Sequence, residues 1–513
     1  MAVFQLVLVL LLGGAALSAI ARRINAPYPA LLAVAGGALA LVPGTPQVTL
    51  DPELALALFV APVLLDAAFD SSPRDMKREW RWVAGLALGA VLVTIAAVAV
   101  VARWIVPAMP WAAAIALGAI VAPPDAAAAS AVLKQLRPPH RLLVILEGES
   151  LFNDATALLV YRLAVGAAVT GVVPGWGAIP EMLLAAAGSV ALAAVYARLI
   201  LWLNPRIHDV PTTVIVQFMG VFALWILAER LHLSAILTMV VFAILVARRA
   251  PDQMPARLRI PSYAVWEVTV FVLNVLAFIL VGLQLRPIVA GLGDGRLLAY
   301  LGTAAAVTAT AIAVRILFVM GAGLYRPVED RHERAAIAWC GMRGIVTVAA
   351  ALALPTGPGG AFPYRDLILF ASFCVVVGTL VVQGLTLPAL MRALGLEDDG
   401  EVEREVRLAR EETARAALDA LAGAPIAPEL VAPVRRRYAA RLPEGDGRRS
   451  VDGADGPDGV AALGNAMRAA LDAERRRLSR LRDDGTIGDD AFHRVEEELD
   501  WADLNVDGLQ RQL

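Results

Sequence analysis

The chain has 513 residues, of which 58% are hydrophobic and 18% charged, and its mean hydropathy is +0.66. This composition excludes one large soluble core and predicts a membrane protein. We therefore expect the lipid bilayer as a partner. The formal net charge is −2, and we expect no nucleic acid as a partner. The two cysteines, Cys340 and Cys374, fall in apolar segments and are predicted to be buried free thiols.

Apolar stretches long enough to cross a bilayer recur from the N-terminus to about residue 392. They lie at 3–20, 27–43, 52–70, 81–103, 111–136, 141–165, 179–203, 210–230, 233–248, 262–286, 297–321, 335–355 and 366–392. The pattern predicts an all-α membrane protein with about thirteen transmembrane helices, forming a transmembrane domain over residues 1–395.

The charges between these segments predict how the chain crosses the membrane. The start "MAVFQ" has no basic residue, whereas Arg22 and Arg23 follow the first apolar run, which favours an uncleaved first span with its N-terminus outside. The loops then predicted to be cytoplasmic hold 17 Lys and Arg, against four on the other side. Because basic residues concentrate in cytoplasmic loops, we expect the C-terminus in the cytoplasm.

Two of the predicted spans are interrupted. In "AIALGAIVAPPDAAAASAVLKQ", Pro123 and Pro124 remove two backbone donors and are followed at once by Asp125. In "AIAWCGMRGIVTVAAALALP", two glycines flank Arg343 at mid-span. These are the fifth and twelfth spans, so they run in opposite directions. Proline kinks alone occur in many membrane proteins, but oppositely oriented breaks that each carry a charge indicate a transporter with inverted repeats and a site near the midplane.

The span "LEGESLFNDATALLVYR" carries three acids within eight residues, Glu147, Glu149 and Asp154. A charge at the centre of a bilayer costs about 2.5–3.5 kcal/mol on insertion scales. Helical spacing places Ser150 and Asp154 on one stripe, and Glu149 and Asn153 on a neighbouring stripe. The polar groups could serve only as hydrogen bonds between helices. A buried aspartate, however, needs a partner, water or a proton. A carboxylate that alternates between a proton and a hard cation has the chemistry of a transporter.

The motifs "EGESLFNDATALL", "APPDAAAA", "AVRILFV" and "GMRGIVTVAAALALP" together resemble the bacterial sodium/proton antiporters of the monovalent cation:proton antiporter-1 family, over about residues 1–395. The resemblance implies thirteen spans, two crossed, interrupted helices, and a homodimer with a dimerisation domain and a moving core domain. It also implies electroneutral 1:1 exchange of Na⁺ or Li⁺ for H⁺ across the bacterial plasma (inner) membrane, for intracellular pH and sodium homeostasis. No cofactor is expected, and the protein is not expected to be an enzyme.

The resemblance also implies roles for individual residues. Asp154 matches the aspartate that binds the ion and the proton, and Asn153 matches its Asn-Asp partner. Asp125 matches the aspartate at the crossing of the broken helices, and Ser150 matches a hydroxyl near the ion. Asp154 and Asp125 are therefore the expected transient ligands of Na⁺.

Three further positions match structural parts of the family's site. Glu149 and Arg315 resemble an acid and a base that form a buried structural ion pair. Arg343 resembles an arginine that offsets helix ends and acids at the second crossing. Where many relatives read Thr-Asp-Pro, this chain reads Pro124-Asp125-Ala126, which removes one hydroxyl near the ion.

Other functions predict different sequence features. A K⁺/H⁺ antiporter of the same family is the main alternative, because the motifs do not separate Na⁺ from K⁺. A cation channel would show a pore loop or rings of acids, which the paired broken helices argue against. An intramembrane aspartyl protease would need a Gly-x-Gly-Asp turn inside a span, whereas the one such stretch, Gly291–Asp294, falls between the predicted spans 262–286 and 297–321.

The composition changes sharply after Leu396. Residues 396–513 hold 27 Asp and Glu against 18 Arg, whereas the first 395 residues hold 20 acids and 27 bases. "EVEREVRLAREETARAALDALAG" and "AMRAALDAERRRLSRLRDD" are predicted to be amphipathic helices, joined through the flexible acidic loop "PEGDGRRSVDGADGPDG". We expect 396–513 to be a soluble, cytoplasmic, mostly helical tail. It is either a solvated stabilising or oligomer-contact module or a regulatory one.

Overall fold

The computed structural model describes residues 2–24, 26–43, 45, 51–125, 128–130, 133, 136, 138–172, 177–290, 297–322, 330–356, 362–422, 438 and 457–511. Within these ranges the chain is helical and contains no strand, which confirms the predicted all-α class. Eight of the helical segments described are long and apolar enough to cross a membrane: Gln5–Arg23, Pro52–Asp70, Trp80–Ile105, Pro180–Arg206, Val210–Arg230, Ala256–Ala290, Leu297–Gly321 and Arg365–Leu394. A multi-pass membrane protein follows.

The count of thirteen spans stays a prediction. Three further apolar helices, Tyr28–Ala40, Trp111–Val121 and Ala235–Ala247, are shorter than a full span. The predicted span 141–165 lies within one long helix, His140–Thr170, which carries the acids, and the predicted span 335–355 is divided into two short helices.

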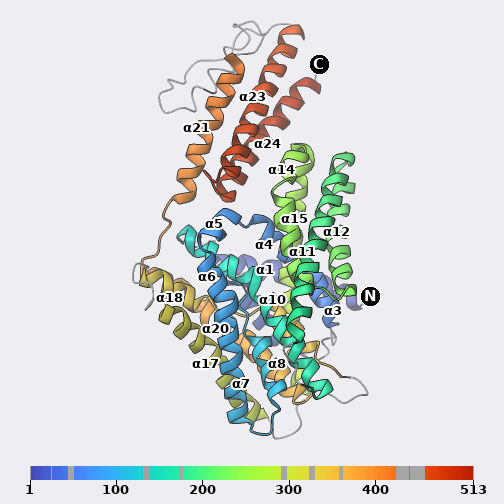
Figure 1. The fold of residues 1–513 in the computed structure, drawn as a ribbon, viewed down its shortest axis with the longest axis vertical. Helices are drawn as coiled ribbons and strands as arrows, with labels where there is room; N and C mark the ends of the chain where they lie inside the picture. The colour runs from blue at the N-terminus through green and yellow to red at the C-terminus, as the bar shows by residue number, and fades with distance from the viewer. Residues whose placement is uncertain are drawn as a thin grey trace.

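The membrane helices pack mainly within two groups (Figure 1). We call the first group the panel: α1 (Ala2–Arg23), α2 (Tyr28–Ala40), α3 (Pro52–Ala55), α4 (Ala61–Asp70), α11 (Ala178–Leu203), α12 (Val210–Arg230), α13 (Ala235–Ala247), α14 (Ala250–Gln253), α15 (Ala256–Leu283) and α16 (Leu285–Ala290). We call the second group the core: α6 (Trp80–Ala84), α7 (Val91–Ile105), α8 (Trp111–Val121), α10 (His140–Thr170), α17 (Leu297–Ala322), α18 (Arg331–Trp339), α19 (Ile345–Leu352) and α20 (Arg365–Leu394). Short helix α5 (Pro73–Arg78) connects them.

Small residues allow the closest packing in the panel. A Cβ atom added at Gly36 of α2 would collide with the backbone of Ile279, and one added at Gly282 of α15 would collide with the backbone of Ala33. The two helices can therefore approach at backbone distance only because both positions are glycine.

The two predicted interruptions are present in the core. Helix α8 ends at Val121, before the two prolines, and Asp125 lies in a segment without regular structure. Helix α18 ends at Trp339, and α19 begins at Ile345. The backbone N–H of Asp125 donates to the carbonyl oxygen of Met342 at 2.7 Å, so the two breaks lie against each other.

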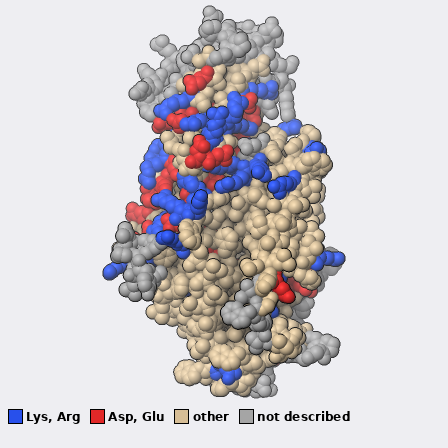
Figure 2. Space-filling view, viewed as in Figure 1, with Lys and Arg blue, Asp and Glu red and all other residues tan. Residues whose placement is uncertain are grey.

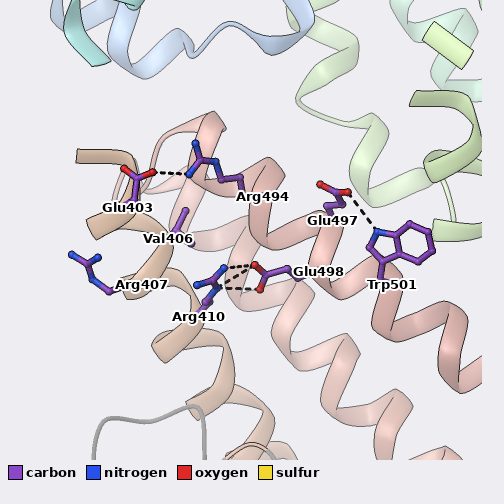
Figure 3. A pocket seen from close by; sticks show the side chains of 8 residues that line it. All are labelled: Glu403, Val406, Arg407, Arg410, Arg494, Glu497, Glu498 and Trp501. Carbon is purple, nitrogen blue, oxygen red and sulfur yellow. Dashed lines mark hydrogen bonds and ion pairs between the residues drawn. The ribbon is translucent and has the colours of Figure 1, made fainter. Parts of the chain in front are cut away.

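Among the described residues after α20, three helices pack together as a bundle: α21 (Glu401–Ala422), α23 (Pro457–Asp483) and α24 (Asp489–Arg511) (Figure 1). The apolar interior of this bundle includes Val406, Leu478 and Phe492. In Figure 3, the ion pairs Arg494–Glu403 (3.0 Å) and Arg410–Glu498 connect α24 to α21 across a surface groove. Residues 443–456 of the predicted acidic loop lie outside the described residues. Helix α23 begins at Pro457, within the last three residues of that loop.

Charge is distributed unevenly over the molecule. Figure 2 shows that Lys, Arg, Asp and Glu gather on the tail and on the adjoining end of the membrane helices, whereas the rest of this face is mostly free of charged side chains. A surface of this kind fits a bilayer around the lower body and water around the tail.

Candidate functional site

Asp125 lies at the contact between the two breaks. Its backbone is fixed on Met342, as described above, and its carboxylate lies directly against Gly344. A Cβ atom added at Gly344 would overlap this carboxylate. Glycine at position 344 therefore makes room for the acid, in addition to weakening the helix.

Helix α10 brings a second acid to the same place. Asn153 is fully buried, and its Nδ2 atom donates to the carbonyl oxygen of Pro124 at 2.7 Å. The carbonyl needs such a donor because the helix is open at the prolines. The next residue, Asp154, is 7% exposed and lies within electrostatic range of Asp125.

Both acids line one large cavity between the panel and the core. Its volume is about 1510 Å³, and Ser150, one turn before Asp154, also contributes to its wall. Other lining groups come from both sides: Thr347 and Gly344 of the core, and Tyr28, Phe271 and Asn274 of the panel. At the crossing of the broken helices, the cavity thus offers the carboxylates of Asp125 and Asp154 and several neutral oxygen atoms to a small cation.

Glu149 and Arg315 lie away from that cavity, in contact with each other. Arg315 donates from Nη1 and Nη2 to the two carboxylate oxygens of Glu149, at 2.5 and 2.8 Å. Both side chains are almost completely buried. Arg315 also donates to the carbonyl oxygen of Ile337 at 3.1 Å, in the last turn of α18.

Arg343 lies in the break between α18 and α19, and its side chain reaches the C-terminal end of α8. Its Nε atom donates at 3.0 Å to the carbonyl oxygen of Val121, the last residue of α8, and its guanidinium also contacts the carbonyl oxygen of Gly341. The last carbonyls of a helix have no partners within it and carry partial negative charge. Arg315 and Arg343 therefore each place a positive charge at a helix C-terminus inside the core.

Sequence analysis missed the support for Arg343. The backbone N–H of Arg343 donates to Oγ1 of Thr379 on α20 at 3.0 Å, and this threonine is fully buried. It also missed the oxygen groups of Thr347 and Asn274 in the cavity wall. Single threonines and asparagines inside apolar helices are common, and no local pattern separates these from the rest.

Comparisons with known proteins find relatives that cover most of the chain. The model of a family described as sodium/hydrogen exchanger, transmembrane, matches residues 7–393. The chain is 30% identical over 532 residues to an uncharacterised Na⁺/H⁺ exchanger of Mycobacterium tuberculosis, covering 98% of this chain and 96% of the relative. It is also 30% identical over 422 residues to a sodium, potassium, lithium and rubidium/H⁺ antiporter of Bacillus subtilis, covering 76% and 62%. Among solved structures, a sodium proton antiporter from Methanocaldococcus jannaschii matches with a TM-score of 0.60 and 18% identity, covering 77% of this chain and 99% of that one.

Proposed function

Because the chain belongs to the sodium/hydrogen exchanger family, it is a membrane antiporter that exchanges Na⁺ for H⁺, and we propose that Asp154 binds the two ions in turn. The observation that carries this assignment is the position of Asp154 in the large cavity between panel and core, next to a neutral amide that is anchored on the broken helix. In this position a carboxylate can exchange one monovalent cation for one proton.

The neighbours of Asp154 have different roles in this proposal. Asp125 and Ser150 supply further oxygen atoms for a transiently bound Na⁺, since hard cations prefer oxygen ligands. Asn153 positions the site, because its amide is held by Pro124 and does not titrate. Its Oδ1 atom has no hydrogen-bond partner among the described residues, which leaves it for the ion or for Asp154.

Competition between the ions produces exchange. Moving an uncompensated carboxylate through a dry barrier costs several kcal/mol, so only a site that carries Na⁺ or H⁺ crosses easily. In our proposal the core moves against the panel and exposes the site alternately to the two sides. Glu149, Arg315 and Arg343 stay in place within the core and hold its broken helices.

The wider setting is also part of the proposal. We place residues 1–395 in the bacterial inner membrane as a homodimer, with the N-terminus outside. The tail, residues 396–513, lies in the cytoplasm, which agrees with the charge distribution in Figure 2. Exchange in this setting regulates intracellular sodium and pH.

Potassium is the second candidate ion. The Bacillus subtilis relative is named for sodium, potassium, lithium and rubidium. In this chain Pro124 precedes the crossing aspartate, so that position supplies no side-chain hydroxyl to the ion. Flux measured separately with Na⁺, Li⁺ and K⁺ across a pH gradient in proteoliposomes decides between them.

The assignment of Asp154 is tested with Asp154→Asn. Asparagine keeps the shape of the side chain but cannot bind a proton in exchange for a cation, so sodium-driven pH change should fall to the level of empty vesicles. Thermal stability and detergent elution should stay like those of the wild type. Asp209→Asn is the matched control, because Asp209 is an exposed residue that caps helix α12 and asparagine also caps helices. Wild-type exchange by Asp154→Asn would contradict the proposal.

A further inference from the structure

The tail helix α24 is attached to the panel by a buried ion pair. Arg259 of α15 is 2% exposed, and its Nε atom donates to Oδ2 of Asp500 at 2.6 Å. Glu496, one turn earlier on α24, lies 3.2 Å from the same guanidinium. The ring of His493 also stacks on Phe69 of α4, with centroids 6.0 Å apart. These contacts hold α24 on two panel helices.

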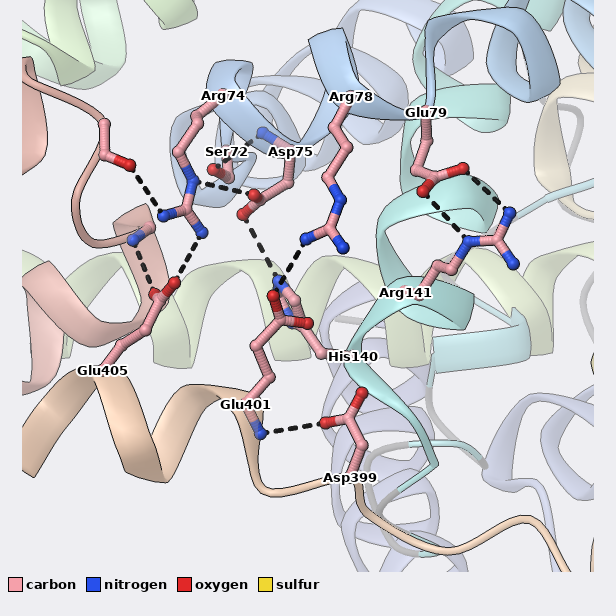
Figure 4. A network of polar contacts seen from close by, with 12 residues as sticks. Ser72, Arg74, Asp75, Arg78, Glu79, His140, Arg141, Asp399, Glu401 and Glu405 are labelled. Atoms are coloured by element: carbon pink, nitrogen blue, oxygen red, sulfur yellow. Dashed lines mark hydrogen bonds and ion pairs between the residues drawn. The ribbon is translucent and has the colours of Figure 1, made fainter.

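The same tail helix also contacts the core. Oδ2 of Asp490, in the first turn of α24, lies 3.3 Å from Nδ1 of His140, the residue just before the predicted span 141–165. The other ring nitrogen, Nε2, lies 3.4 Å from Oδ2 of Asp75 on the connecting helix α5 (Figure 4). His140 begins α10, the helix that carries Asp154.

Helix α21 adds contacts to the connection between the two groups. Arg74 of α5 donates to Glu405 at 2.8 Å, and Arg78 donates to Glu401 at 3.0 Å (Figure 4). Arg74 also reaches the carbonyl oxygen of Gly485, just before α24. The tail is therefore in contact with the panel, the core and the helix that joins them.

This arrangement restricts the movement that exchange requires. A rigid bundle that contacts both groups resists a displacement of one against the other, unless the contacts on one side open. In addition, Glu496, Asp500 and Trp501 line the same cavity as Asp125 and Asp154, so the docked tail forms part of the wall on the path to the site.

We propose that the docked tail is a brake on exchange, and that His140 makes its docking dependent on cytoplasmic pH. The inference rests on the proposed exchange at Asp154. Asp490 joins the brake to the core only while His140 is protonated, because the charged ring then pairs with the Asp490 carboxylate.

The surroundings of His140 give the direction of the pH dependence. The charged groups around the ring come from α5 (Arg74, Asp75 and Arg78), α10 (Arg141), the segment just before α21 (Asp399), the first residue of α21 (Glu401) and α24 (Asp490). Burial disfavours the charged ring, but the hydrogen bond to Asp75 and the charges of Asp490, Asp75 and Glu401 outweigh it and raise the pKa of His140 above its usual 6.5. Asp490 and Glu401 belong to the tail, so their charges raise the pKa of His140 only while the tail is docked. A group whose pKa is raised by docking stabilises the docked state fully below its undocked pKa and loses this effect as the pH rises through the docked pKa. The contact between α24 and the core through His140 is therefore stronger in an acidic cytoplasm than in an alkaline one.

Exchange should follow the state of the tail. In wild-type proteoliposomes, with the pH varied on the tail side, we expect exchange to rise severalfold between about pH 6 and pH 8, the range in which histidine titrates. His140→Gln removes the titration but keeps a polar side chain, so exchange near pH 6 should approach the alkaline rate. His208→Gln, at an exposed histidine between α11 and α12, should keep the wild-type profile.

Asp490, the partner of His140 in the tail, allows an independent test. Asp490→Asn should relieve the acid inhibition as His140→Gln does, and the double variant should show no further increase, because both changes remove one contact. Asp484→Asn, at an exposed tail position, is the control. Additive effects, or a wild-type profile in both single variants, would overturn the proposal.

Docking itself is measured without transport. Amide hydrogen exchange over α24 in the full-length Asp154→Asn protein should be slower near pH 6 than near pH 8 after correction for the intrinsic rates, and His140→Gln should remove the difference. If Asp154→Asn still exchanges ions while docking responds to pH, the ion site is wrong and the brake stands. Equal corrected protection of α24 at both pH values would refute the brake.

Discussion

Asp154 and Glu149 lie only five positions apart on α10, yet their surroundings differ in kind. The spacing turns their side chains by about 140° around the helix, so they reach different environments. Glu149 is neutralised by Arg315 through two hydrogen bonds, whereas Asp154 faces the cavity with the neutral Asn153 and the acidic Asp125 near it. An acid with a fixed counter-charge has little reason to exchange ions. We therefore propose a structural role for Glu149 and a role in transport for Asp154.

The pair of Glu149 and Arg315 is tested by a double-mutant cycle on thermal stability. Glu149→Gln or Arg315→Met leaves one buried charge without its partner, and each should destabilise the protein by roughly 3–5 kcal/mol. The double variant should recover part of this loss, because no unpaired charge remains.

The cycle also shows whether the contact exists. If the two single losses simply add in the double variant, the residues do not interact in the folded protein. Thr310→Val is a suitable control on α17, since this hydroxyl bonds only within its own helix in the described structure and should not couple to Glu149.

For single residues, the sequence predicted which side chains belong to the site, but it did not predict which atoms they contact. Three acids in an apolar span draw attention without any structure. The hydrogen bond from Asn153 to Pro124 joins positions 29 apart, and the one from Arg343 to Thr379 joins positions 36 apart. Such pairings depend on how the helices cross, which no local pattern records.

At the scale of elements, the two interrupted helices were predictable because prolines and glycines act locally on the backbone. The sequence indicated where α8 ends and where the segment between α18 and α19 opens. It did not indicate that the two segments contact each other through Asp125 and Met342, or that Gly344 accommodates the carboxylate of Asp125. The role of this glycine is steric, and it appears only when both breaks are placed together.

Gly344→Ala tests this steric role. The added methyl group would overlap the Asp125 carboxylate, which must then move away from the site. Since a displacement of about 1 Å in a positioned group can cost up to 100-fold in rate, we expect exchange to fall by one to two orders of magnitude. Initial rates of sodium-driven pH change in proteoliposomes measure the effect.

Gly85→Ala provides the comparison, because a Cβ atom at this position in the core would meet no atom within 4 Å. It should keep near-wild-type exchange. An equal, small effect of both substitutions would show that Asp125 does not need its position against residue 344.

For the whole molecule, the sequence predicted a membrane domain and a charged helical tail but not how they meet. The change in composition after Leu396 is visible along the chain. The docking contacts are not, since Arg74 meets Glu405 across 331 positions and Arg259 meets Asp500 across 241. Arginines near a membrane surface are expected for topology alone. Only the folded chain shows that some of them bind the tail.

The overall charge balance of the cycle yields the last prediction. In the proposed cycle Asp154 carries one Na⁺ in one direction or one H⁺ in the other, and Asn153 cannot titrate. Exchange is then electroneutral as long as Asp125 keeps one protonation state throughout the cycle. Its closeness to Asp154 makes this condition testable, because two nearby carboxylates titrate as a coupled pair and together can release two protons.

The measurement is flux in proteoliposomes with a clamped membrane potential, at several sodium and pH gradients. We expect the gradients at which net flux reverses to be the same at every potential, because one positive charge enters for each that leaves. A reversal point that shifts with voltage would mean that Asp125 also binds and releases a proton in each cycle. In that case Asp125→Asn should restore a reversal point that is independent of voltage if exchange survives, since asparagine leaves Asp154 as the one titrating carboxylate at the crossing.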